Sequence, residues 1–137
     1  MDAISSVAWR HEASALAAVT GLNLPVALQC VGGRHEVLLR VLHRFAERYR
    51  SGEPQLLQGD LPDGARAISA ACHSLRGACA SVGALGLAVA AQRLESELSV
   101  VGKLDDAAAD RCRRLQSELQ AFVARLLTAL AQEDTRH

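Results

Sequence analysis

Four long segments of the chain carry apolar residues at the alternating three- and four-residue spacing of a single buried helix face. The clearest stripe predicts a helix over about 63–82, with apolar residues at Ile68, Cys72, Leu75, Cys79 and Val82. Similar stripes predict helices from residue 34 to about 49, from 87 to 101, and from 105 almost to the C-terminus. No strand pattern competes with them. Such helices, joined by short polar segments, predict an all-α fold, an antiparallel four-helix bundle.

A further short helix is expected over 23–31, because Asn23 is a suitable N-cap, Pro25 fits the first turn and Gly32-Gly33 follows it. Two readings are open for the helix that begins at residue 34. Ser51-Gly52 and Pro54 weaken or kink it, or Leu56-Leu57 continues the same rod.

The remaining breakers separate the long helices. Residues 59–64 predict a loop, and Gly83 is suited to the left-handed conformation that ends many helices. Gly102 closes the next stripe, and Asp105 or Asp106 is expected to cap the last helix.

Residues 1–20 show only a weak amphipathic pattern, formed by Ile4, Val7, His11, Leu16 and Val19 before Thr20-Gly21. We therefore expect an extra N-terminal segment, partly helical, that is an extension or a linker. The bundle domain is expected over 21–134, a length that can bury one real core.

The composition of the chain narrows the classes of function that it can have. Apolar residues make up 50% of the chain but aromatic residues only 3%, so the core must be built from leucine, valine and alanine. A formal net charge of zero gives no support to a nucleic-acid partner. No apolar run approaches the roughly 18 residues that span a bilayer, and no signal-peptide layout is present, so no direct membrane contact and a cytoplasmic location are expected. The cysteines form no CxxC pair and are interpreted as small buried apolar residues in a reducing compartment.

His73 lies one residue out of phase with the stripe of its helix, so its side chain should project about 100° away from the core and reach solvent. Gly77 costs about 1 kcal/mol relative to alanine inside a helix, and we interpret it as clearance for a docking partner. The expected docking residues are small or cationic and share this face: Arg66, Ser69, Ala70, Gly77 and Ala80.

An exposed imidazole in such a clearing suggests phosphoryl chemistry, because a neutral ring nitrogen is nucleophilic near pH 7. The other ring N–H needs an acceptor, and phosphoryl oxygens need a cation. Arg76, one turn after His73, supplies the cation. Glu95 is the expected acceptor, because it lies one residue out of phase with the apolar stripe of the next helix, and Gln92 is the reserve.

Several short motifs resemble the signature of histidine-containing phosphotransfer (HPt) domains, which reads His-x-Leu-Lys-Gly, then a Gly-Ala turn, then Leu-Glu. The matching runs are His73-Ser74-Leu75-Arg76-Gly77-Ala78, Val82-Gly83-Ala84 and Leu94-Glu95. The upstream runs Gly21-Leu22-Asn23-Leu24, Val31-Gly32-Gly33 and Leu39 to Tyr49 resemble the first helices of HPt domains from hybrid sensor kinases. The resemblance covers about residues 21–130. Arg76 stands where the family has lysine; the charge is kept, but the group is a planar fork rather than a point charge.

The resemblance implies a phosphorelay intermediate of a multi-step two-component system. His73 would accept a phosphoryl group from the aspartate of a receiver domain and pass it to another receiver, on a response regulator. Arg76 would stabilise phosphoryl charge and Glu95 would bond the imidazole. No cofactor is expected on this chain, and Mg²⁺ would be supplied by the receiver. The chain would not be an enzyme on its own, whereas a parent hybrid sensor kinase would be a protein-histidine kinase. A monomer is expected.

Two alternatives are weighed against this interpretation. The dimerisation and phosphotransfer hairpin of sensor kinases has an acidic residue directly after its histidine, where this chain has Ser74, so that module fits less well. A non-catalytic helical adapter with an incidental histidine is the alternative of a different class. Histidines 11, 35, 43 and 137 and the arginines 111, 113 and 114 are interpreted as ordinary structural or solvated residues.

Overall fold

The computed structural model describes residues 14–60, 62–101 and 103–135. Within these ranges every regular element is helical and there is no strand, which confirms the all-α prediction. The elements are α2 (Ser14–Ala17), α3 (Leu24–Cys30), α4 (His35–Arg48), the 3₁₀ turn η1 (Pro54–Leu57), α5 (Gly64–Ser81), α6 (Leu85–Val101) and α7 (Asp106–Thr135).

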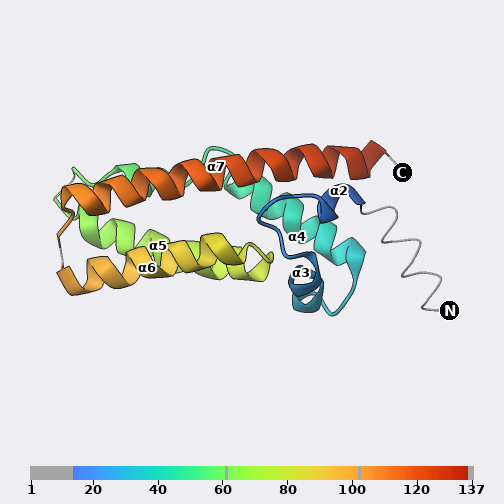
Figure 1. Ribbon diagram of the computed structural model, residues 1–137, viewed down its shortest axis with the longest axis horizontal. Helices are drawn as coiled ribbons and strands as arrows, with labels where there is room; N and C mark the ends of the chain where they lie inside the picture. Colours follow the sequence, from blue (N-terminus) through green and yellow to red (C-terminus); the bar gives the residue numbers. More distant parts are fainter. Residues whose placement is uncertain (1–13, 61, 102, 136–137) are drawn as a thin grey trace.

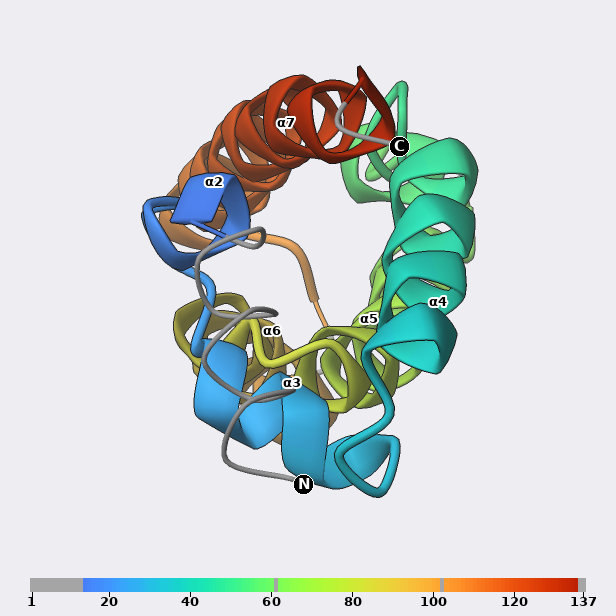
Figure 2. The same cartoon turned by 90° about the vertical axis from the view of Figure 1, so that its right-hand side faces the viewer.

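The four long helices form an up-and-down bundle. Helices α5 and α6 lie side by side as an antiparallel hairpin, and α7 runs along the whole length of the molecule above them (Figure 1). Helix α4 is shorter and packs against α7 near the end of the bundle where α3 lies. Beyond α4 in the sequence, η1 packs against both α5 and α7. Viewed end-on, the four helices surround one common interior, with α2 and α3 added at one end (Figure 2). The predicted antiparallel four-helix bundle with an N-terminal addition is confirmed.

The predicted apolar stripes supply the core. The fully buried positions come from all four long helices and include Leu38, Leu42, Ile68, Cys72, Leu75, Cys79, Ala91, Leu94, Cys112, Leu119, Phe122 and Leu126. One face of each helix therefore points inward along its length, and residues one position out of phase, such as His73, lie at the surface. Cys30 is exposed, so the prediction of a buried residue was wrong at that position.

The turn between α5 and α6 is fixed by its contact with α3. Gly83 has φ +77°, a conformation that glycine adopts without strain, and a Cβ there would lie 2.5 Å from the carbonyl oxygen of Asn23. The Asn23 N–H donates to the Gly83 carbonyl oxygen at 2.8 Å, and the Asn23 side chain caps α3 by accepting from Val26 N–H at 3.1 Å. This packing sets the register of α5 against α6, which positions the residues on their shared face.

Helix α4 ends at Arg48, and the reading in which Leu56-Leu57 continues the same rod was wrong. Gly52 turns the chain with φ +78°, and Leu56 and Leu57 belong to η1 instead. The buried Gln116 side chain on α7 stabilises this break: its Oε1 accepts from Glu53 N–H at 2.8 Å, and its Nε2 donates to the Glu53 carbonyl at 3.0 Å. A contact across the bundle therefore holds the turn that follows α4.

The N-terminal segment contributes to the core. Leu16 and Val19, which precede the domain boundary expected at residue 21, are buried, and α2 packs against α7. Ile4, Val7, His11, Gly102 and His137 lie outside the described residues. At the start of α7, Asp105 is the cap, accepting from Ala108 N–H at 2.7 Å. None of the helices described is long and apolar enough to cross a bilayer.

Candidate functional site

His73 lies on the surface of α5, as its phase predicted. Its side chain is 63% exposed, whereas its neighbour Cys72 is fully buried. The imidazole is therefore open to a partner molecule while its helix is anchored in the core.

The contact predicted between His73 and Glu95 is present. Nδ1 of His73 lies 2.9 Å from Oε2 of Glu95, which reaches across from α6 and is only 21% exposed. Gln92, the reserve candidate, is exposed one turn earlier and lines a neighbouring hollow. The 22-residue separation of the pair is bridged by the α5–α6 turn at Gly83.

The charge of Glu95 determines which ring nitrogen carries the proton. An ionised carboxylate only accepts hydrogen bonds, so Nδ1 must be the protonated nitrogen and donate to Oε2. Nε2 then keeps its lone pair in the neutral ring. Nη2 of Arg76 also lies 3.1 Å from Nδ1, but in this tautomer two donors face each other there, so that approach is not a hydrogen bond. The Arg76 contact that does hold is the ion pair from Nε to Oε1 of Glu95 at 3.0 Å.

Two hollows flank His73 and contain the expected docking residues. One, of about 720 Å³, is lined by Arg66, Ser69, Ala70, Ser74 and Ser99 together with His73 and Glu95. The other, of about 540 Å³, is lined by Arg76, Gly77, Ala80, Leu85, Ala88, Val89 and Gln92 together with His73. The imidazole therefore stands between two depressions formed by α5 and α6.

No contact within the described part of the chain requires a glycine at position 77. A Cβ built there meets no atom within 4 Å among the described residues, and the helix continues through Gly77 without a break. Among the described residues nothing compensates for the cost of this glycine to the helix, which is consistent with clearance for something outside the chain.

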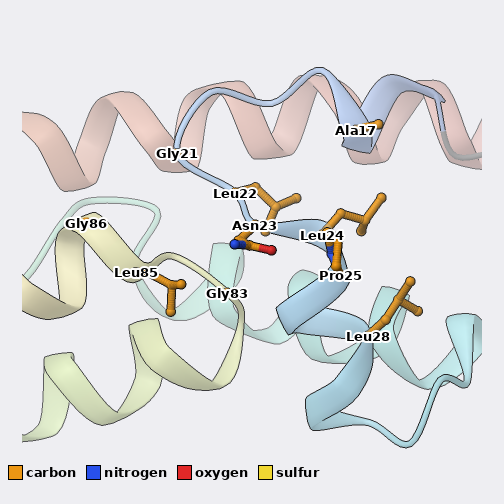
Figure 3. Close-up of a pocket in the computed structure, with 10 residues that line it drawn as sticks. All are labelled: Ala17, Gly21, Leu22, Asn23, Leu24, Pro25, Leu28, Gly83, Leu85 and Gly86. Atoms are coloured by element: carbon orange, nitrogen blue, oxygen red, sulfur yellow. The ribbon is translucent and has the colours of Figure 1, made fainter.

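Two apolar residues of this surface were missed by the sequence analysis. Leu85 and Val89 on α6 are 38% and 46% exposed and line the second hollow. The sequence pattern could have revealed them, because Leu85 and Val89 are four residues apart and lie out of phase with the buried stripe that includes Ala91 and Leu94. Leu85 also borders an apolar groove of about 750 Å³, whose far side carries Leu22, Leu24 and Leu28 (Figure 3).

The buried thiols take no part in this site. Burial raises the pKa of both Cys72 and Cys79 to about 12, so they stay protonated near neutral pH. In the arginine cluster of α7, Arg111 is paired with Glu97 and Arg113 with Asp110, in line with a solvated helix surface.

Comparison with known protein families defines the class. The family model described as "Hpt domain" matches residues 38–133, from α4 to the last turns of α7 and through the whole α5–α6 hairpin. The chain therefore belongs to the Hpt domain family. Members are phosphocarrier modules of two-component phosphorelay signalling rather than kinases, and the family interacts with receiver domains. No significant match is found among curated proteins or among solved structures.

Proposed function

We propose that His73 is the phospho-acceptor of a phosphorelay, taking a phosphoryl group from a receiver aspartate and passing it to the receiver of a response regulator. The observation that carries this proposal is the hydrogen bond from Nδ1 to Glu95 on an otherwise exposed ring. It leaves Nε2 as the nitrogen with a lone pair in the neutral imidazole.

The transfer balances without further reactants. The Nε2 lone pair attacks the phosphorus of the aspartyl phosphate, an N–P bond forms, and the P–O bond to the aspartate breaks, releasing its carboxylate. Because Nδ1 keeps its proton, the ring becomes an imidazolium, and the Glu95 carboxylate 2.9 Å away stabilises that positive charge. The reverse sequence, with the aspartate of the second receiver as nucleophile, returns the ring to its neutral form.

The surroundings suit a docked receiver. The Arg76 guanidinium is 37% exposed beside the ring and can donate to phosphoryl oxygens. Gly77 and Ala80 leave room for a partner, and Leu85 and Val89 offer it apolar surface. Together they supply an approach path, a cation and a contact area on one face of the α5–α6 hairpin.

The remaining parts of the reaction are assigned to the partner. Mg²⁺ would be bound by the receiver, which also carries the aspartate. By resemblance to HPt domains of hybrid sensor kinases, we propose that this chain acts in the cytoplasm, that a parent hybrid chain would be the protein-histidine kinase, and that the domain acts as a monomer.

Incubation with a ³²P-labelled receiver domain tests the proposal. We expect an acid-labile, alkali-stable label on the wild-type chain and none on His73→Gln, with the thermal midpoint of the variant nearly unchanged because the residue is exposed. His43→Gln, which alters another exposed histidine on α4, is the matched control and should be labelled normally. No label on the wild type across a panel of receivers would instead support the helical adapter.

A further inference from the structure

A separate hollow lies between α6 and α7, on a different side of α6 from His73. It has a volume of about 210 Å³ and is lined by Ala90, Arg93 and Leu94 of α6 and by Arg111, Arg114, Leu115 and Glu118 of α7. It shares no residue with the two hollows beside His73. Arg93 is two residues before Glu95, so these two side chains project about 160° apart around the helix. A molecule bound in this hollow would therefore leave the surface around His73 open.

The lining of this hollow combines an apolar floor with a cationic rim. Leu94 and Leu115 are only 2% and 3% exposed and anchor the two helices in the core. The three arginines of the lining are exposed. An apolar centre with a polar, charged rim is the usual composition of a small protein interface.

The charges of the rim are only partly matched within the chain. Arg111 is paired, because its guanidinium donates to the Glu97 carboxylate, with Nε 2.8 Å from Oε2. Arg93 and Arg114 form no ion pair or hydrogen bond with any described residue. Glu118, one turn after Arg114, is the acidic residue of the lining. Two guanidinium groups are therefore available to carboxylates from outside the chain.

The size and polarity of the hollow indicate what it can bind. Pockets for drug-sized molecules typically have about 300–1,000 Å³, so this hollow is suited to a single side chain of a larger partner. A bare anion gains nothing from an apolar floor, because it loses hydration there without new hydrogen bonds. Guanidinium groups bind carboxylates well, through two parallel N–H donors. An apolar side chain with carboxylates on either side matches both the floor and the rim.

We propose that this hollow is a docking site for an acidic segment of a partner protein. One apolar side chain of the segment enters the hollow, and neighbouring carboxylates pair with Arg93 and Arg114. The carboxylate of Glu118 repels such a segment and keeps its binding weak and reversible. The site does not depend on the proposed role of His73, and its position allows the chain to hold this partner while a receiver docks at His73.

Titration of the ¹⁵N-labelled full chain with the capped peptide Glu-Glu-Glu-Leu-Glu-Glu-Glu, followed by ¹H–¹⁵N NMR, tests the site. We expect saturable shifts of the Nε–H signals of Arg93 and Arg114, with no shifts around His73. The peptide with glutamine in place of every glutamate should not bind. The peptide with serine in place of leucine should bind about tenfold more weakly, because it lacks the apolar side chain.

Variants of the chain test each part of the rim. Arg93→Glu combined with Arg114→Glu should weaken binding of the acidic peptide by about tenfold or more, because two attractions become repulsions. Arg40→Glu combined with Arg44→Glu makes the same change in net charge at exposed positions of α4 and is the matched control, which should bind normally. Glu118→Gln should strengthen binding by about two- to threefold, because it removes the repulsion. Circular dichroism checks that the helices of each variant are intact.

Several outcomes would overturn the proposal: no saturable shifts with the acidic peptide, equal binding of the glutamine peptide, or an equal loss of binding in the α4 control. Saturation of the same signals by inorganic phosphate would show a general anion site instead. Phosphoryl transfer measured with the peptide at saturation should keep its rate, and slower transfer would contradict the separation of the two surfaces. Since the titration needs no receiver, failure of phosphoryl acceptance would refute the proposed function and leave this docking site untouched.

Discussion

Replacing Gly77 by leucine separates the stability of the bundle from its reactivity. The residue lies in the interior of α5, on the same face as His73, and a side chain added there meets no atom within 4 Å among the described residues. The substitution should therefore improve the helix while placing four carbons in the hollow where we expect the receiver to dock.

The magnitudes follow from the geometry. Glycine costs about 1 kcal/mol relative to alanine in a helix, and leucine is nearly as favourable as alanine, so the free energy of unfolding should rise by about 0.5–1 kcal/mol. For a chain of this length that corresponds to an increase of about 2–5 °C in the thermal midpoint. Overpacking typically costs about 1–3 kcal/mol, and each 1.4 kcal/mol is tenfold, so transfer at subsaturating receiver should slow by about 5- to 140-fold.

Thermal unfolding and rapid-quench transfer kinetics check the two halves separately. Ala121→Leu, which adds a side chain to an exposed position of α7, is the matched control and should transfer at the wild-type rate. Unchanged transfer in Gly77→Leu would refute the docking role of this face. A drop in the thermal midpoint would refute the conclusion that the space around Gly77 is open within the chain.

Three further outcomes are expected. Glu95→Ala should slow phosphoryl transfer by about 10- to 100-fold in single-turnover assays, because the loss of a side chain that orients a reactive group typically lowers activity by this factor. Complete loss of transfer would show that Glu95 is indispensable and does more than orient the imidazole. Gly83→Ala should lower the free energy of unfolding, measured by urea titration, by about 2–4 kcal/mol. The φ of +77° disfavours alanine, and the new Cβ would lie 2.5 Å from the Asn23 carbonyl oxygen. A loss below about 0.5 kcal/mol would contradict the tight turn. Burial raises the pKa of Cys72 and Cys79 from 9.0 to about 12. As the pH rises above 9, the thiols of the unfolded chain therefore lose their protons before those of the folded chain, which favours unfolding. For each thiol the free energy of unfolding should fall by up to about 1.4 kcal/mol per pH unit between these two pKa values. A urea midpoint that is equal or higher at pH 10 than at pH 8 would contradict the burial of both thiols.

The parts of the fold that sequence could predict depend on local rules. The stripe from Ile68 to Val82 specifies a helix and its buried face, and the Asn23 cap and the left-handed Gly83 act within one turn of the chain. His73 and Glu95 could be paired in advance because each lies one residue out of phase with its own stripe. The Gly83 turn then brings those two positions together.

Whether the chain continues as one rod beyond α4 could not be decided from the sequence, because part of what holds the break lies elsewhere in the chain. Ser51-Gly52 and Pro54 mark a weak point, but the apolar residues resume at Leu56-Leu57, so both readings stayed open. What stabilises the break is the Gln116 amide on α7, bonded to both backbone groups of Glu53, 63 residues away. No periodicity argument detects a buried amide that serves a distant turn.

The Arg76–Glu95 ion pair shows a second limit. Residue spacing placed Arg76 beside His73 and assigned it to phosphoryl charge, but which acceptor its Nε contacts depends on side-chain rotamers and not on helix phase. The exposed apolar residues Leu85 and Val89 are a different case. Their position outside the buried stripe of α6 could be read from the sequence, and only their role on the surface beside His73 was overlooked. Their apolar character became informative once the hollow beside His73 was defined.

The central claim is that Nε2 of His73 carries the phosphoryl group, and its most direct test is ¹H–¹⁵N and ³¹P NMR of the chain after transfer from a phosphorylated receiver. The account predicts a single phosphohistidine, at residue 73, with phosphorus bonded to Nε2 and the proton retained on Nδ1 beside Glu95. Phosphate on Nδ1, or on any residue other than His73, would contradict it.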